Sequence, residues 1–329
     1  MAADGEPDGD PAAGASGAAG DLDHATAVFA EVRPRLFGIA YRMLGSAAEA
    51  EDLVQDVWLR WQTYDRAAVA DPAAFLATTT ARLAINVLKS ARVRRETYVG
   101  PWLPEPVDTG ADPHLGAERG EALNLAVLML LERLSPTERA AYVLREAFDY
   151  PYPQIAAIVQ VGEAAARQLV SRARKHLRSG RRAPVTGAEQ RRLLTAFVAA
   201  ARAGDLAALE ELLAADAVSY SDGGGAARAS RFPVVGAVRV AKYVRAFASR
   251  FWEGVDVEWA TVNGQAAALL RRDGEVFTVL TVDASDRGIG RIMWMMNPAK
   301  IAAVSGSRSA DPGAPRLLAP PPGREDGRR

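Results

Sequence analysis

The stretch LSPTERAAYVLREAFDYPYPQIAAIVQVGEAAARQLVSRARKHLR, residues 134–178, decides the fold of the middle of this chain. Its first residues form a helix N-terminus, because Ser135 is a typical N-cap, Pro136 stands at the first helical position and Glu138 stands at the capping-box position. A helix therefore begins at this point.

Two further helices are expected in the same stretch. The pattern predicts a short helix from about Tyr152 to Val159, a turn around Val161-Gly162 and a longer helix from Glu163 to about Leu177. Two helices joined by a tight turn with Gly, the second strongly basic, are typical of a helix-turn-helix.

The second of these helices carries a basic outer face. Residues 163–182 contain seven Lys or Arg and one acid. Arg and Gln at the front of such a helix are the residue types that read guanine and adenine edges in the major groove. A solvated basic face on an ordinary bundle helix is the alternative. The outward candidates are Arg167, Gln168, Ser171, Arg172 and Lys175, and the inward set is Leu169, Val170, Ala173 and Leu177.

Upstream, residues 27–62 predict two helices that are separated at Gly45-Ser46. The second helix is acidic, and part of its acidic surface follows the i, i+3, i+4, i+7 spacing of one helix face. This is either a solvated face with acids near the helix N-terminus or a surface that binds a partner. The residues on this face are Asp52, Gln55, Asp56 and Leu59.

A third helix begins at Asp71-Pro72, an N-cap followed by Pro at the first helical position. Its second half is basic, with five bases and no acid between Arg82 and Arg95. Arg and Lys interrupted by Asn and Thr suit phosphate and base contacts. The candidates are Arg82, Asn86, Lys89 and Arg92, with Arg94 and Arg95 at the end of the helix.

Between the two helical parts lies YVGPWLPEP, residues 98–106, which we call the strap. Its three prolines exclude helix interior and central strand, so it is extended and stiff. Trp102 and Leu103 in this strap need an apolar surface to lie against.

The order of these parts resembles an extracytoplasmic-function (ECF) sigma factor, a small relative of bacterial sigma-70, over about residues 23–182. AEDLVQDVWLRW is similar to the region that binds the β′ clamp helices of RNA polymerase, which implies core contacts by Asp52, Gln55 and Asp56. FLATTTARLAINVLKSARVRR is similar to the regions that melt and read the −10 promoter element, and PYPQIAAIVQVGEAAARQLVSRARKHL to the region that reads the −35 element. The implied partners are the RNA polymerase core (β′ clamp helices and β flap) and promoter DNA.

The chain continues well beyond the length usual for that family. Residues 189–218 predict two amphipathic helices broken at Gly204-Asp205, and GAVRVAKYVRAFASRF predicts another. Four strand patterns follow (VEWATVN, QAAALLRRD, EVFTVLTVD and GRIMWMMN), with hairpin signals at Asn263-Gly264 and Asp273-Gly274. Helices followed by an antiparallel meander predict an α+β domain.

This last part resembles a SnoaL-like domain of the nuclear-transport-factor-two-like cone fold. SDGGG and NPAK resemble the DGGGK-type and NPxK-type motifs of sigma factors with this extension, and the strap resembles their linker signature. Ala226 stands where the first motif has Lys, and Arg228 is the nearby candidate to replace it. The resemblance implies an interdomain regulatory set made of Trp102, Leu103, Pro104, Asp222, Gly223, Gly224, Gly225, Asn297, Pro298 and Lys300.

Relatives of the cone fold include enzymes, but the residues favour no catalysis. A general base needs a positioned carboxylate or His, and all three histidines lie outside this domain. Asp222 and Asp283 remain as candidate acids, with Tyr220 and Trp294 as candidate pocket walls. We therefore expect no catalytic residues, no metal and no cofactor, and we keep a small-molecule ligand of the SnoaL-like domain as an open alternative.

Composition sets the remaining limits. The formal net charge is zero, but the charges are segregated along the chain, and local patches are what bind phosphates. The chain has no cysteine, no signal-like N-terminus and no apolar run of about 18 residues, so we expect a cytoplasmic protein without a membrane contact. The expected division is a disordered tail at 1–22, a first sigma domain at 23–96, a Pro-rich linker at 97–119, a second sigma domain at 120–183, a SnoaL-like domain at 187–304 and a second disordered tail at 305–329.

The sequence thus predicts two all-α sigma domains, the second with a helix-turn-helix, followed by an α+β SnoaL-like cone. The predicted function is an ECF sigma factor that is regulated in cis by its last domain. We further expect the strap to dock on that domain near residues 222–225 and 297–300. One alternative is a helix-turn-helix regulator fused to a small-molecule-binding or catalytic SnoaL-like domain, which would bind DNA without polymerase. The other is an enzyme with a secondary sigma-like half.

Overall fold

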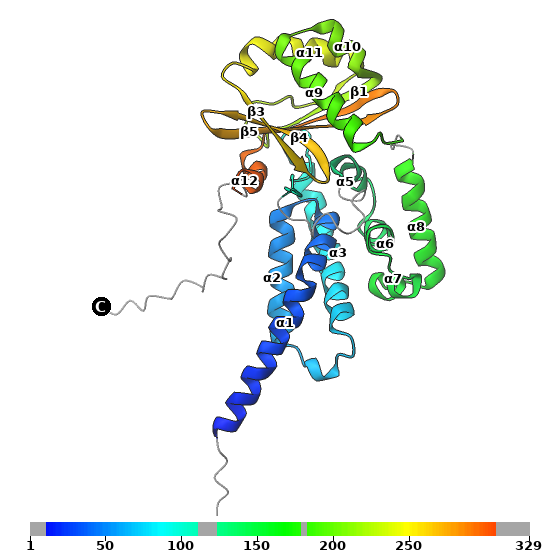
Figure 1. Ribbon diagram of the computed structural model, residues 1–329. Coiled ribbons are helices and arrows are strands. Elements are labelled where there is room, and N and C mark those ends of the chain that lie inside the picture. Colours follow the sequence, from blue (N-terminus) through cyan, green and yellow to red (C-terminus); the bar gives the residue numbers. More distant parts are fainter. Residues whose placement is uncertain (1–10, 111–123, 179–182, 307–329) are drawn as a thin grey trace, which may run out of the picture.

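The computed structural model describes residues 11–110, 124–178 and 183–306. Two helical parts are followed by a mixed helix-and-sheet part, as the sequence predicts (Figure 1). The first helical part consists of α1 (Pro11–Leu44), α2 (Ala47–Thr63), the short 3-10 helix η1 (Arg66–Ala68) and α3 (Pro72–Glu96). The second consists of α5 (Leu125–Leu131), α6 (Pro136–Phe148), α7 (Tyr152–Val159) and α8 (Glu163–Arg178).

The predicted helix starts are confirmed by their caps. Ser46 accepts a hydrogen bond from the backbone N–H of Glu49 at 3.1 Å, and Asp71 caps α3 in the same way. Both hydrogen bonds of the capping box between Ser135 and Glu138 are present. In the helix-turn-helix, the left-handed residue is Gln160, with φ of 59°, and Gly162 does not adopt a positive φ.

The first and last described helices extend into the two expected tails. Helix α1 begins at Pro11, so residues 11–22, which the sequence predicts to be part of an unstructured tail, are helical. At the other end, helix α12 runs from Pro298 to Gly306 and includes the expected tail residues 305 and 306. The remainder of both predicted tails lies outside the described residues.

The C-terminal part combines helices with one six-stranded sheet. Its elements are α9 (Gly187–Ala203), α10 (Leu206–Leu212), β1 (Leu213–Asp222), β2 (Val234–Val235), α11 (Ala237–Phe251), β3 (Asp256–Val262), β4 (Gln265–Arg272), β5 (Glu275–Ser285), β6 (Gly288–Met295) and α12. The strand order is β2-β1-β6-β5-β4-β3. The expected antiparallel meander covers only β3–β6, because β1 pairs with β6 in parallel.

The two hairpin turns form as predicted. Asn263 and Gly264 have φ of 52° and 73°, and Asp273 and Gly274 have φ of 52° and 82°. Two consecutive residues with positive φ define the tight hairpin turn that Asn-Gly and Asp-Gly favour.

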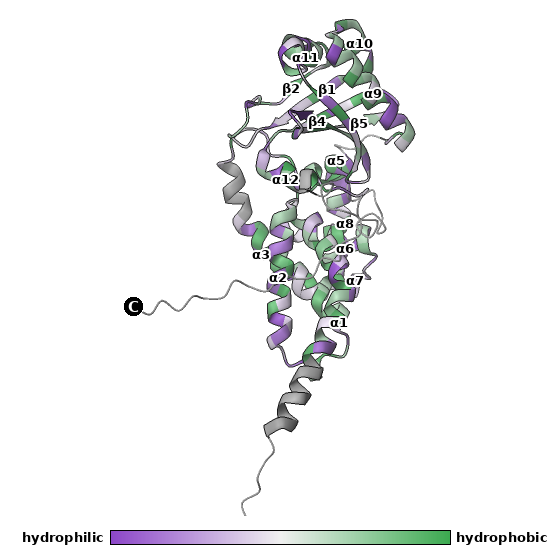
Figure 2. Ribbon diagram, turned by 60° about the vertical axis from the view of Figure 1, so that its left-hand side comes forward, coloured by the Kyte–Doolittle hydropathy of each residue, from purple (hydrophilic) through white to green (hydrophobic). Residues whose placement is uncertain are grey.

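The sheet is buried on both faces, and this arrangement positions the strap. Along β4, Ala267 and Leu269 belong to the same core as the helical half, whereas Ala268 and Leu270 belong to the core under α9–α11. In Figure 1 the sheet lies between α9–α11 on one side and the helical half on the other. Green and purple bands alternate along the long helices in Figure 2, as expected of helices with one buried side. None of the helices in the described ranges is both long and apolar enough to cross a membrane.

Candidate functional site

The strap lies between the helical half and the sheet, and Asp222 at the end of β1 is its main anchor. The side chain of Asp222 is fully buried. Its carboxylate accepts hydrogen bonds from the Tyr98 hydroxyl at 2.6 Å, the Leu103 backbone N–H at 2.9 Å and the Gly224 backbone N–H at 3.1 Å. Burial and the adjacent carboxylate raise the pKa of Tyr98 well above its ordinary value. Two of these three donors belong to the strap.

Lys300 in α12 completes this anchor. Its ammonium group donates to Asp222 at 2.7 Å and to the Leu103 carbonyl at 2.5 Å. The same nitrogen lies 4.3 Å from the ring centre of Trp102 and 4.9 Å from that of Tyr98, within cation–π range. The Lys300 side chain is only 7% exposed, so this ion pair lies in the protein interior. We call Tyr98, Trp102, Leu103, Asp222 and Lys300 the clamp.

Glycines next to the clamp allow the close approach. A Cβ on Gly224, whose φ is 58°, would collide with the side-chain amide of Asn297. That amide donates to the Tyr98 hydroxyl at 2.9 Å. A Cβ on Gly223 would collide with the Ala227 carbonyl, and Gly225 lies next to Val99 of the strap. Thus both sequence motifs of the C-terminal part face the strap, together with the buried Pro104 and with Pro298, the first residue of α12.

The chain immediately after the strap is held by the β3–β4 hairpin. Asn263 exchanges two hydrogen bonds with Val107, both of 2.9 Å, one through its side chain and one through its backbone. Its amide group also donates to the Tyr41 hydroxyl at 2.7 Å, and that hydroxyl donates to the Glu105 carbonyl at 2.5 Å. The sequence indicated Asn263 only as a turn residue, and no local signal reveals its contact with α1.

The other side of the strap packs on the first helical part. The Glu105 carboxylate accepts from the first backbone N–H groups of α2, at 2.5 Å from Ala47 and 3.0 Å from Ala48. A Cβ on Gly45 would lie 2.8 Å from the Trp102 ring, so this ring covers the α1–α2 corner. Trp102 therefore contacts both the helices before it and Lys300 after it.

The predicted polymerase-binding residues lie on an open surface. Asp52, Gln55 and Asp56 are exposed on α2. Leu59 on the same face is 59% exposed, a large value for an apolar side chain, while the opposite face of α2 is buried. The structure thus presents an acidic surface with an exposed apolar residue at its C-terminal end.

The predicted −10 residues differ from one another in their surroundings. Asn86 and Lys89 are exposed on α3, whereas the side chain of Arg92 lies outside the described part of the chain. Arg82 donates to the backbone carbonyls of Ala157 at 2.8 Å and Ile158 at 3.2 Å. These carbonyls belong to the last turn of α7, which attracts cations. Arg82 therefore links the two helical parts.

The predicted −35 residues all lie on the exposed side of α8, and the inward set is buried. Gln168, Ser171 and Lys175 project from this side. Arg167 pairs with Glu163 and lies over the ring of Tyr152, 5.3 Å from its centre. Arg172 donates to Glu138 of the capping box at 3.1 Å. Burial works against ionisation of Glu138, but hydrogen bonds from Ser135 and Arg172 hold the pKa of this carboxyl below its usual value.

Two buried arginines join α1 to α6, and sequence reasoning missed both. Arg42 and Arg139 are 1% and 2% exposed. Arg139 donates to the Arg42 carbonyl at 3.1 Å and forms an ion pair with Glu132. Burial lowers the pKa of Arg139 to about 9, which still leaves it charged at neutral pH. These residues connect the two helical parts in the interior, next to the strap.

The candidate acids of the C-terminal part are both engaged. Asp222 is held in the clamp, and Asp283 accepts from Arg291 at 2.7 Å. The Trp294 indole donates to Ser219 at 3.1 Å. In the described ranges, no three His, Cys, Asp or Glu side chains lie close enough to hold a metal ion. These carboxylates therefore serve ion pairs in this structure.

Family comparisons match the helical half of the chain. Sigma-70 region 2 matches residues 28–94, and sigma-70 region 4 matches residues 124–177. These segments contain most of α1–α3 and nearly all of α5–α8.

Individual proteins extend the likeness beyond these regions. The chain is 38% identical over 248 residues to the ECF RNA polymerase sigma factor SigJ of Mycobacterium tuberculosis, covering 73% of this chain and 79% of that protein. It is 34% identical over 195 residues to the probable ECF RNA polymerase sigma factor SigI of the same species, covering 58% of this chain and 67% of that protein. The crystal structure of SigJ matches with a TM-score of 0.68 at 32% identity, covering 84% of this chain and 98% of that chain.

Proposed function

Because the chain belongs to the ECF sigma factors of RNA polymerase, with a C-terminal SnoaL-like domain, we propose that this domain regulates transcription initiation in cis through the strap. Sigma factors bind the RNA polymerase core and promoter DNA, and they are not enzymes in the catalytic sense. The proposal concerns how the last domain influences those two activities.

The exposed faces of α2, α3 and α8 each have a proposed partner. The acidic face of α2, with Asp52, Gln55 and Asp56, binds the β′ clamp helices. The basic side of α3 contacts the −10 element, the outer side of α8 contacts the −35 element, and the second helical domain also meets the β flap. The exposure of these faces and the match to regions 2 and 4 support the assignment. The expected division of the chain, with the sigma domains at 23–96 and 120–183 and the SnoaL-like domain at 187–304, is kept as part of the proposal.

One observation carries the regulatory part, namely the buried clamp. The strap is the covalent link between the two sigma domains, so its path limits how far they separate. Anchoring it to Asp222 and Lys300 ties that path to the SnoaL-like domain. A buried ion pair that loses one partner leaves an uncompensated charge, so a partly opened clamp is energetically unfavourable. This is the behaviour that a two-state regulatory contact requires.

We infer that the docked strap favours a closed form of the two sigma domains. In this structure their side chains share one continuous hydrophobic core, and Arg82 of the −10 surface is engaged with α7. Reading two separate promoter elements requires the domains to move apart. Release of the strap would then favour promoter engagement.

A reversible disulfide tests the proposal directly. Asp108 and Val262 form an isolated antiparallel bridge, flanked by the backbone hydrogen bonds from Asn263 to Val107 and from Thr109 to Thr261. This makes the pair non-hydrogen-bonded, the position where two Cα atoms come closest. Since the chain has no cysteine, Asp108→Cys with Val262→Cys introduces the only two thiols.

The oxidised variant should initiate less transcription with core polymerase than the reduced variant, and a reductant should restore it. Each single cysteine variant is the control for the substitutions themselves. Equal transcription by the oxidised and reduced forms would contradict regulation through the strap. Binding to DNA without any binding to polymerase would instead favour the alternative of a plain helix-turn-helix regulator.

A further inference from the structure

The SnoaL-like domain contains a large cavity on the far side of the clamp. Its volume is about 1030 Å³, at the upper end of the range of about 300–1,000 Å³ for small-molecule sites. The walls come from α11, from strands β4–β6 and from the loop after Asp222. The aromatic residues among them are Tyr243, Phe247, Phe251, Trp252, Phe277 and Trp294.

The charged residues of the lining are of one sign. Four arginines line the cavity, and no Asp or Glu does so among the residues that the structure describes. Arg272 is engaged with the Phe251 carbonyl and the Phe277 ring. In the same described ranges, Arg228 and Arg250 form no ion pair. Two arginines without a counter-charge beside an aromatic wall favour an anion.

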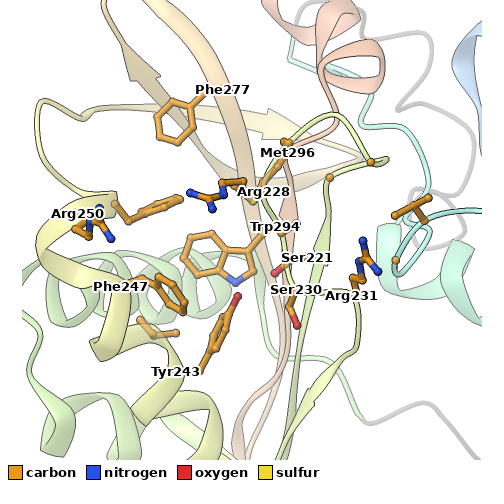
Figure 3. Close-up of a pocket in the computed structure, with 18 of the residues that line it drawn as sticks. Ser221, Arg228, Ser230, Arg231, Tyr243, Phe247, Arg250, Phe277, Trp294 and Met296 are labelled. Carbon is orange, nitrogen blue, oxygen red and sulfur yellow. The ribbon is translucent and has the colours of Figure 1, made fainter.

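The close-up shows how these groups are placed. In Figure 3 the side chain of Arg228 lies next to Trp294 and points toward the side where Arg250 lies. Phe277 and Phe247 lie on opposite sides of the Arg228 side chain. Arg231 lies apart from this pair, beyond Ser221 and Ser230. The cavity thus offers cationic side chains next to a broad aromatic surface. A ligand with one anionic group and an apolar, ring-sized body would satisfy both.

We propose that this cavity binds an amphipathic organic anion, with Arg228 and Arg250 holding its charge and the aromatic walls holding its body. The loop that carries Arg228 follows the motif whose expected lysine is replaced by Ala226. Arg228 therefore acts in the cavity in this structure, away from the ion pair between Asp222 and Lys300.

The ligand site also touches the strap. Val99 and Gly100 line the cavity, together with Gly223 and Gly225 of the loop that follows the clamp aspartate. An occupant in contact with Val99 binds better when the strap is docked, and by thermodynamic reciprocity it then stabilises docking. This consequence rests on the proposed cis regulation, whereas binding of the anion does not.

A matched pair of fluorescent probes tests the site in the full-length chain. One probe is 8-anilinonaphthalene-1-sulfonate, and the other is N-phenyl-1-naphthylamine, which has the same rings without the sulfonate. The wild type should bind both and prefer the anion. Arg228→Ala with Arg250→Ala should weaken binding of the sulfonate by about tenfold or more, as for loss of a charge-assisted contact, and leave the neutral dye within about twofold.

Two further variants locate the dyes. Arg239→Ala removes an exposed arginine of α11 outside the cavity and should change neither affinity. Phe247→Ala removes an apolar wall and should weaken both dyes. No dye binding by the wild type, equal loss of both dyes in the double arginine variant, or unchanged binding by Phe247→Ala would overturn the proposal. Because these readouts do not use transcription, their failure is distinguishable from failure of the disulfide test.

Discussion

Removing the ammonium group of Lys300 should release the strap by an amount that follows from the burial of its partner. In Lys300→Met the side chain keeps its length, but the Asp222 carboxylate remains fully buried with only neutral donors, and the Leu103 carbonyl loses its bond to the ammonium group. Breaking a buried ion pair in this way costs about 3–5 kcal/mol. The loss falls on strap docking, because the Lys300 ammonium group bonds to Asp222 and to the Leu103 carbonyl and lies over the rings of Trp102 and Tyr98.

Hydrogen exchange of the strap measures this loss locally. The Leu103 N–H donates to Asp222 and the Glu105 N–H donates to the Gly45 carbonyl, so both are protected only while the strap is docked. A loss of about 3 kcal/mol should accelerate their exchange about a hundred-fold, since each 1.4 kcal/mol is a factor of ten.

Two comparisons make the result specific to the buried charge. Arg192→Met breaks a surface pair with the same N–O distance of 2.7 Å, and exchange of the strap should stay within about twofold of the wild type. Adding Asp222→Asn to Lys300→Met removes the stranded charge and should restore much of the protection. If Lys300→Met changes exchange no more than Arg192→Met does, or if the double variant is no better than the single one, the reasoning about the clamp is wrong.

The other predictions concern the proposed interfaces and one cap. Asp52→Arg with Asp56→Arg should abolish co-purification with core polymerase while helical content by circular dichroism stays unchanged, and intact binding would refute the assignment of that face. Arg172→Ala should weaken promoter binding by about 1–3 kcal/mol in a manner that depends on the −35 sequence, whereas a uniform loss on unrelated DNA would make Arg172 a phosphate contact. Because hydrogen bonds from Ser135 and Arg172 hold the folded-state pKa of Glu138 below its unfolded value, this carboxylate contributes stability above the unfolded pKa. That stability is lost as the pH falls through the folded-state pKa. The melting temperatures of wild type and Glu138→Gln should therefore differ at pH 7 and converge as the pH falls through the folded-state pKa, and a constant difference would exclude the carboxylate as the cause.

Local patterns in the sequence predicted elements well wherever one short segment decides the structure. The capping box at Ser135 and the two hairpin turns depend on residues within four positions, and all of them form. Strand β1 was missed, because its Ala-rich start continues the pattern of α10 and its strand character comes from pairing with β6. The sequence does not predict helix α12 either, since Pro298 and Lys300 stand out as parts of a short motif and not as the first turn of a helix.

Contacts between distant segments were predictable only where an unusual composition pointed to them. A proline-rich stretch that carries Trp102 and Leu103 requires an apolar surface, and this requirement led to the expectation that the strap contacts the C-terminal domain. The bond between Asn263 and Tyr41 joins residues 222 positions apart, and nothing near either residue indicates the other. The same holds for Arg82, whose basic surroundings suggested nucleic acid while its observed partners are carbonyls of α7.

The engagement of Arg82 with α7 has a consequence for measured affinities. On the proposed assignment, the same guanidinium serves as an internal ligand in the free chain and as a DNA ligand at the promoter, so the two uses are mutually exclusive. The apparent dissociation constant for a −10 strand then equals the intrinsic constant divided by the fraction of molecules in which Arg82 is not bonded to α7. If that fraction is one in a hundred, binding by the isolated chain is a hundred-fold weaker than the surface itself allows. A polymerase core that separates the sigma domains would raise the fraction toward one, so DNA affinity would depend on the enzyme that carries the factor.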